Sequence, residues 1–217
     1  MANSNLRGAP VKVGALIFFT VLLLEGCVGG GDGPVPRGAE YTTLDGTEAL
    51  LWGEGDYGVV LAHGASYDAA SWEPQAKEMA RNGMIVLAVE DTSGESIATA
   101  AEYLKEKRAA HGVALIGSSA GTSGVLEAAQ AHPRLPDQLI ILSGAGDVSR
   151  LGACPKLFVA SEGEGLAEEA RRMAEEAPGT HNEALIVAGD AHAQGIFDTE
   201  EGERLMDAIL DRLRRYR

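Results

Sequence analysis

Two adjacent serines, Ser118 and Ser119, lie between glycines in the segment ALIGSSAGTSG, residues 114–124. Residues 117–121 fit the pattern Gly-x-Ser-x-Gly, with Ser119 at its centre. In a sharp turn from a strand into a helix, this pattern exposes the central hydroxyl, and small residues are needed two positions to either side. Free backbone N–H groups at the start of the helix can stabilise negative charge beside that hydroxyl. The pattern therefore indicates that Ser119 is a nucleophile and that Ser118 is a small neighbour in the turn.

Three other interpretations of this segment predict different chemistry. A phosphate-binding loop needs a lysine after the last glycine, but Thr122 and Ser123 follow Gly121. The dinucleotide-binding pattern Gly-x-Gly-x-x-Gly fails because Ser119 stands in place of the second glycine. A serine that only caps the helix is compatible with the pentapeptide, so residues elsewhere in the chain must decide.

A serine hydroxyl is a weak nucleophile at neutral pH unless a histidine accepts its proton and a carboxylate orients that histidine. Among the five histidines, His192 lies after the last predicted strand and before the last predicted helix, where a loop can reach Ser119. His63 follows an earlier strand, and we expect it to bond to nearby backbone rather than to transfer protons. The other three end predicted helices or lie in a polar turn, so His192 is the expected base.

The carboxylate is expected between the serine and the histidine in chain order. A predicted strand that ends at residue 160 opens into the acidic segment SEGEG, residues 161–165. Glu164, which is flanked by glycines, is the preferred acid. Glu162 is the near alternative, and Asp147, after the preceding strand, is a more distant one.

The loop after the predicted strand 58–62 could stabilise an anionic intermediate. Acyl transfer develops negative charge on the carbonyl oxygen of the substrate, and backbone N–H groups can bind it. Gly64 lets the backbone turn inward and present the N–H of Ala65. The N–H of Ala120, at the start of the helix after Ser119, is the expected second donor.

From residue 39 onward, short β-branched segments alternate with longer segments of helical periodicity. Strands are predicted at residues 41–43, 49–52, 58–62, 84–89, 113–117, 138–143, 156–160 and 184–187. Helices are predicted at residues 71–82, 96–110, 120–131, 166–177 and 199–215. Continuous apolar strands such as IVLAV and LIIL imply burial on both faces. The pattern predicts an α/β fold with a mostly parallel central sheet, helices on both faces and an antiparallel hairpin at the start.

Four segments of the chain resemble the α/β-hydrolase superfamily, and within it dienelactone hydrolases and esterases: GSSAG, the acidic loop after LFVA, AHAQG and AHGAS. The resemblance implies Ser119 as nucleophile, Glu164 as acid and His192 as base. It also implies an oxyanion hole made by the backbone amides of Ala65 and Ala120.

Many relatives insert a cap domain at the connection that here spans residues 144–154. About ten residues cannot form a lid with its own core, so no cap domain is expected and water should enter freely. The expected activity is hydrolysis of a small carboxylic ester through an acyl-enzyme intermediate. Lipase, thioesterase and amidase activities use the same machinery and stay open, as does a hydrolase-fold surface lipoprotein that binds without catalysis. No cofactor or metal is expected, because the histidines and cysteines lack the spacing of a ligand set.

The N-terminal segment is expected to direct export. Arg7 and Lys12 precede an apolar run at residues 13–24, which is short for a membrane span and typical of a signal sequence. Its end, LLLEGC, resembles a bacterial lipoprotein signal, which implies that Cys27 carries lipid and tethers the protein to the cell envelope. Glu25 departs from that pattern, and ordinary secretion or an uncleaved signal anchor is the alternative. The expected organisation is an export segment at 1–27, a Gly/Pro-rich linker at 28–38 and a hydrolase domain at 39–217.

The composition narrows the class of partner. The 217-residue chain carries a formal net charge of −14, which repels nucleic acid and anionic lipid, so a small molecule or a neutral surface is the expected target. Lipid on Cys27 would leave Cys154 without a disulfide partner. Cys154 is therefore expected to be a buried small hydrophobic residue.

Overall fold

A computed structural model describes residue 1 and residues 35–217 of the chain. Most of the predicted export segment, the proposed lipid attachment site Cys27 and residues 28–34 of the predicted linker lie outside the described residues. Within the described part, no helix is long and apolar enough to cross a membrane.

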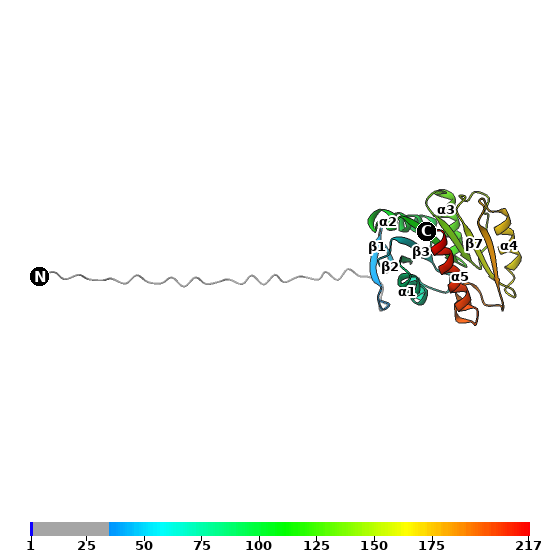
Figure 1. The fold of residues 1–217 in the computed structure, drawn as a ribbon, viewed down its shortest axis with the longest axis horizontal. Coiled ribbons are helices and arrows are strands. Elements are labelled where there is room, and N and C mark those ends of the chain that lie inside the picture. Colours follow the sequence, from blue (N-terminus) through cyan, green and yellow to red (C-terminus); the bar gives the residue numbers. More distant parts are fainter. Residues whose placement is uncertain (2–34) are drawn as a thin grey trace. The chain divides into compact units, whose positions relative to one another are not determined.

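The core element of the folded part is one eight-stranded sheet (Figure 1). Its strands are β1 (Glu40–Leu44), β2 (Thr47–Trp52), β3 (Tyr57–Ala62), β4 (Met84–Val89), β5 (Gly112–Ser118), β6 (Gln138–Leu142), β7 (Lys156–Ser161) and β8 (Asn182–Val187). Their order across the sheet is β1-β2-β4-β3-β5-β6-β7-β8. The pairs β1–β2 and β2–β4 are antiparallel, and all the others are parallel. The predicted mostly parallel sheet with an antiparallel start is confirmed.

Helices cover both faces of this sheet. They are η1 (Ala69–Trp72), α1 (Glu73–Arg81), α2 (Gly94–Lys107), α3 (Gly121–Ala131), α4 (Ala167–Glu176), η2 (Ala193–Asp198) and α5 (Gly202–Arg215), where η denotes a 3₁₀-helix. On one face, Ile97 of α2, Val125 of α3 and Met173 of α4 belong to one buried apolar cluster. On the other face, Met79 of α1 and Ile209 of α5 belong to a second one. All side chains of β3, β4 and β5 are buried, because each strand packs against both layers of helices.

The parallel strands bring the predicted site residues to one edge of the sheet. Ala62 at the end of β3 pairs with Gly117 of β5, and Ser118 at the end of β5 pairs with Leu142 of β6. Ser161 at the end of β7 pairs with the last residue of β8. The loops that follow these five strands therefore start side by side, as expected at the carboxyl edge of an α/β sheet.

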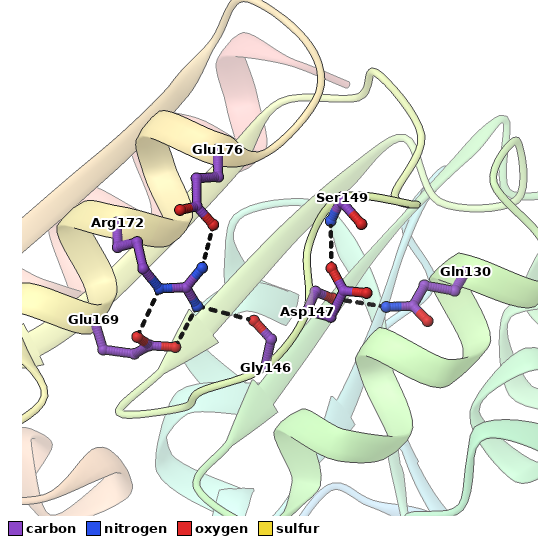
Figure 2. A network of polar contacts seen from close by, with 7 residues as sticks. All are labelled: Gln130, Gly146, Asp147, Ser149, Glu169, Arg172 and Glu176. Carbon is purple, nitrogen blue, oxygen red and sulfur yellow. Dashed lines mark hydrogen bonds and ion pairs between the residues drawn. The ribbon is translucent and has the colours of Figure 1, made fainter.

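The connection between β6 and β7, residues 143–155, contains no helix or strand, so the predicted absence of a cap domain is confirmed. Two helices hold this connection in place (Figure 2). The guanidinium of Arg172 on α4 donates to the carbonyl oxygen of Gly146 at 3.2 Å. The side-chain amide of Gln130 on α3 donates to the carbonyl oxygen of Asp147 at 2.7 Å.

Three helices differ from the predictions. The helix predicted at 96–110 is α2, Gly94–Lys107, which ends three residues earlier. The segment predicted as one helix at 71–82 is η1 followed by α1, in which Pro74 occupies the first turn. Proline lacks an N–H and fits only the first turn of a helix, so a regular α-helix starts there. The closing helix was expected from residue 199 but begins at Gly202, and the unpredicted 3₁₀-helix η2 comes before it.

Candidate active site

Ser119 lies in a sharp turn between β5 and α3. Its φ angle is +49°, in the left-handed region that residues other than glycine rarely adopt. A Cβ atom on Gly121 would lie 2.5 Å from the carbonyl oxygen of Ala62, so glycine is needed for α3 to approach β3 this closely. The side chain of Ser119 is partly exposed, whereas Ser118 is buried. The predicted need for small residues around Ser119 thus has a direct steric cause.

His192 connects Ser119 to an acidic side chain. Its Nε2 atom lies 2.7 Å from Oγ of Ser119, and its Nδ1 atom lies 2.6 Å from Oε2 of Glu164. A neutral imidazole with its proton on Nδ1 donates to the carboxylate and accepts the serine proton on Nε2. The three residues come from three different loops and form one continuous hydrogen-bonded chain. About half of the His192 side chain is exposed to solvent, at 50%.

The carboxylate of Glu164 is buried and held from several sides. Its side chain is 3% exposed. Its Oε1 atom accepts hydrogen bonds from the backbone N–H of Ser161 at 2.6 Å and from Oγ of Ser143 at 2.7 Å. With Oε2 on His192, both oxygens are engaged, so the carboxylate has a fixed orientation.

The two alternative acids do not contact His192. Glu162 is exposed, and its backbone N–H donates to the carbonyl oxygen of Val187 at 3.0 Å. Asp147 lies in the β6–β7 connection, where its carboxylate accepts from the backbone N–H of Ser149 at 2.9 Å (Figure 2). Hydrogen bonds from Ser149 also lower the pKa of Asp147 below its ordinary value. Of the three candidates, the structure brings only Glu164 to the histidine.

Ser143 is a fourth side chain in this cluster, and the sequence interpretation missed it. It follows β6 directly, is 3% exposed and has a φ angle of +49°. Besides donating to Glu164, its Oγ atom accepts from the backbone N–H of Ala193 at 2.8 Å. Ser143 therefore joins the loop of the acid to the residue after His192. No local pattern distinguishes it from an ordinary serine at the end of a strand.

One predicted oxyanion donor, Ala120, follows Ser119 in the turn before α3, and the other, Ala65, lies in the loop after β3. A Cβ atom on Gly64 would lie 3.3 Å from the Cβ atom of Ser119, so the loop after β3 passes directly beside the serine. Ala65 and Ala120 are both exposed. Within the described residues their backbone N–H groups have no hydrogen-bond partner, so both are available to a ligand.

His63 makes contacts with backbone, as expected from the sequence. Its Nδ1 atom lies 2.9 Å from the carbonyl oxygen of Gly64, and its Nε2 atom lies 3.2 Å from the carbonyl oxygen of Glu90. Both partners are hydrogen-bond acceptors, and a neutral ring carries one N–H, so the tautomer decides to which carbonyl oxygen it donates. His63 thus helps to shape the loop beside Ser119.

In the part of the chain that the structure describes, no group of three or more histidine, cysteine, aspartate or glutamate side chains could hold a metal ion. Cys154 is partly buried and packs against the apolar core on the side of α2, α3 and α4. Burial raises the pKa of its thiol above the ordinary value, which disfavours the reactive thiolate.

The eight-stranded, mostly parallel sheet with helices on both faces and a serine at the turn after β5 is an α/β-hydrolase fold. No protein-family model and no curated protein matches the chain. Solved structures with similar folds include proteins named as hydrolases, lipases and esterases.

One of them is a monoacylglycerol lipase from Paleococcus ferrophilus, with a TM-score of 0.68 and 16% identity over 82% of this chain and 100% of that one. A predicted CIB-like hydrolase from Thermoplasma acidophilum gives a TM-score of 0.62 and 18% identity over 82% of this chain and 97% of that one. An esterase from Exiguobacterium antarcticum gives a TM-score of 0.60 and 12% identity over 82% and 99%. At these identities the likeness establishes a shared fold.

Proposed function

We propose that this protein is a serine hydrolase that cleaves a carboxylic ester. The observation that carries the proposal is the hydrogen-bonded chain from Ser119 through His192 to Glu164, with distances of 2.7 and 2.6 Å. Each group lies in the order and the geometry that proton transfer from a serine nucleophile needs.

In the proposed reaction, Oγ of Ser119 attacks the acyl carbon while Nε2 of His192 accepts the hydroxyl proton. The buried carboxylate of Glu164 holds the ring and stabilises the imidazolium that forms. The backbone N–H groups of Ala65 and Ala120 bind the oxyanion of the tetrahedral intermediate. His192 then gives the proton to the leaving alcohol, and the acyl group stays on Oγ of Ser119. Water next attacks the acyl carbon while Nε2 of His192 accepts its proton, the bond to Oγ breaks, and His192 returns the proton to Ser119 as the acid leaves.

Three features favour a small, uncharged ester as the substrate. Ser119 and His192 are open to solvent and no cap domain covers them, so water can reach the acyl-enzyme. The net charge of −14 repels anionic substrates. Structures with the same fold carry the names lipase and esterase, which supports ester hydrolysis within this class.

We also propose that the protein is exported and anchored to the cell envelope through lipid on Cys27. The support is the sequence itself, which has basic residues, an apolar run and the segment LLLEGC in the order of a lipoprotein signal. Secretion without lipid is the alternative.

The function is tested by replacing each of the two adjacent serines. Ser119→Ala removes the nucleophile, and we expect kcat on p-nitrophenyl butyrate to fall on the order of 10⁴-fold or more. Labelling by a fluorophosphonate should disappear as well. Ser118→Ala is the matched control, because Ser118 is buried and its Oγ atom has no hydrogen-bond partner in the described part of the chain. This variant should keep its activity and its label.

A series of p-nitrophenyl esters of increasing acyl length, run with the same two variants, identifies the preferred acyl group. A folded wild-type protein that neither hydrolyses these esters nor takes the label would contradict the proposed function. That result would favour a binding protein with a hydrolase fold.

A further inference from the structure

Gln194 joins the two loops that flank the reacting groups. It stands two residues after His192, in η2, and the residue is buried, at 6% exposure. Its Oε1 atom accepts a hydrogen bond from the backbone N–H of Gly64 at 3.1 Å. This contact links the segment that carries the proposed base to the segment that carries the proposed oxyanion donor, across 130 residues of sequence.

The second end of the Gln194 amide is held as well. Its Nε2 atom donates to Oγ of Ser71 at 2.9 Å. The hydroxyl of Ser71 in turn donates to the carbonyl oxygen of Asp68 at 2.5 Å, so its lone pairs face Gln194. An N–H donor at one end and a hydroxyl acceptor at the other allow only one orientation of the amide.

Gly64 is the residue whose backbone sets the direction of the Ala65 N–H. The carbonyl oxygen of Gly64 accepts from the backbone N–H of Tyr67 at 3.0 Å and lies 2.9 Å from Nδ1 of His63. In a trans peptide the C=O and the following N–H point in opposite directions, so contacts on the Gly64 carbonyl turn the Ala65 N–H the other way. The hydrogen bond to Gln194 fixes the preceding peptide, between His63 and Gly64, through the Gly64 N–H.

We propose that Gln194 is a positioning residue for the hydrolysis proposed above, on which this inference rests. It holds the loop of residues 63–68 at a constant distance from His192, so that the Ala65 N–H and the base face the same acyl group. The Ala65 N–H binds the oxyanion, which exists only in the transition state and the tetrahedral intermediate. Loss of the Gln194 contacts should therefore lower kcat more than it changes KM.

The test compares three variants. Gln194→Met keeps the size of the side chain and removes both hydrogen bonds. Ser71→Ala removes the hydroxyl that accepts from Nε2 of Gln194 but leaves Oε1 of Gln194 as the acceptor for the Gly64 N–H. Gln138→Met is the matched control, since it makes the same replacement of a buried, hydrogen-bonded glutamine at the first residue of β6, the end of that strand opposite to Ser143.

For Gln194→Met we expect kcat to fall by about 10- to 100-fold, part of the loss seen when an oxyanion donor is removed, with KM changed by less than about threefold. Ser71→Ala should give a smaller loss of the same kind. The second-order rate of fluorophosphonate labelling should fall in parallel, because the phosphonyl oxygen occupies the same donors. Amide hydrogen exchange at Gly64 should become faster in Gln194→Met at temperatures well below the Tm, where the variant is folded, whether or not a substrate is present.

The outcomes separate this inference from the proposed function. An active wild type together with a Gln194→Met variant that matches Gln138→Met in kcat would overturn the positioning role. So would a loss of activity that follows only the fall in Tm, with unchanged exchange at Gly64. A wild-type protein with neither activity nor label would instead overturn the proposed function.

Discussion

Glu162 and Glu164 are separated by one residue in the chain, yet their surroundings differ completely. Glu164 turns inward because the N–H of Ser161 and the hydroxyl of Ser143 bind its carboxylate. Glycine at 165 has a φ angle of +86°, which lets the chain leave this turn sharply after the acid. Glu162 stays at the surface. The proposed acid is thus selected by the donors around it rather than by the order of residues.

Replacing each glutamate by glutamine tests this assignment. Glu164→Gln keeps the shape but cannot stabilise the imidazolium or hold the Nδ1 proton, so kcat should fall on the order of 10³- to 10⁴-fold. Glu162→Gln should leave kcat within about twofold, since an exposed side chain without contact to the site has little influence. Steady-state kinetics on p-nitrophenyl butyrate measure both. Equal losses in the two variants, or a loss only in Glu162→Gln, would show that Glu164 is not the acid.

The sequence predicts the residues whose roles depend on a local pattern. Ser119 stands out because glycines two positions away allow its turn, and His192 because it lies between the last strand and the last helix. Ser143 and Gln194 carry no such pattern. Their partners, Ala193 and Gly64, lie 50 and 130 residues away, and only the folded chain brings them into contact.

At the scale of elements, α4 acts as a support for the connection between β6 and β7. Arg172 reaches from α4 to the carbonyl oxygen of Gly146, and Glu169 and Glu176 on the same helix pair with its guanidinium (Figure 2). The connection begins at Ser143, which holds the proposed acid. The helix therefore restrains a segment that has no secondary structure of its own and that touches the site.

Arg172→Met removes this support, and Arg171→Met is its matched control. Within residues 35–217, Arg171 pairs only with Glu168 on its own helix, so its replacement leaves the connection attached. Because these side chains are partly exposed, we expect each variant to lose no more than about 1 kcal/mol of unfolding free energy. The two should differ in hydrogen exchange, which becomes faster at residues 145–149 in Arg172→Met alone. Equal exchange in both variants would mean that Arg172 does not restrain the connection.

The stabilisation by the ion pair between Arg172 and Glu169 depends on pH. The hydrogen bond from Arg172 lowers the pKa of Glu169 below its ordinary value. A carboxyl whose pKa is lower in the folded state stabilises the fold above its unfolded pKa, and this contribution is lost as pH falls through the folded pKa. The stability difference between wild type and Arg172→Met should therefore shrink at acidic pH.

Most strands and helices follow from the sequence because their signals are strong and continuous. β4 matches its predicted range of 84–89, since MIVLAV is apolar throughout and bounded by polar residues. The 3₁₀-helix η2 was not predicted, because six residues with neither an acidic first turn nor a side-chain cap carry no helical signal. The order of the strands across the sheet could not be predicted from the sequence either. β4 lies between β2 and β3, which only packing of whole helices and strands decides.

At the scale of the whole molecule, the fold and the proposed localisation of the protein depend on separate parts of the chain. The hydrolase fold lies within residues 35–217, and the proposed lipid attachment site precedes it. Residues 28–38, between these two parts, are rich in glycine and proline.

The anchoring proposal is tested with the two cysteines of the chain. In a Gram-negative host fed an alkyne fatty acid, the full-length protein should carry the label and sediment with membranes. Cys27→Ser should lose both the label and the membrane association, because the thiol is the acceptor of the lipid. Cys154→Ser, the control, should keep both. An unlabelled wild type recovered in the soluble fraction would show that the lipoprotein interpretation is wrong.

Three of the five non-glycine residues with left-handed backbone in the described chain, Ser119, Ser143 and Ala193, cluster around the proposed site. Such a conformation costs a residue with a Cβ atom roughly 1–2 kcal/mol, which glycine would avoid. A chain optimised for folding alone would therefore carry glycine at positions 119 and 143, and it would lose both hydroxyls. Engineering for heat resistance should leave this cluster untouched and begin at Asp45 and Ala109, where the same backbone strain supports no contact of the proposed site.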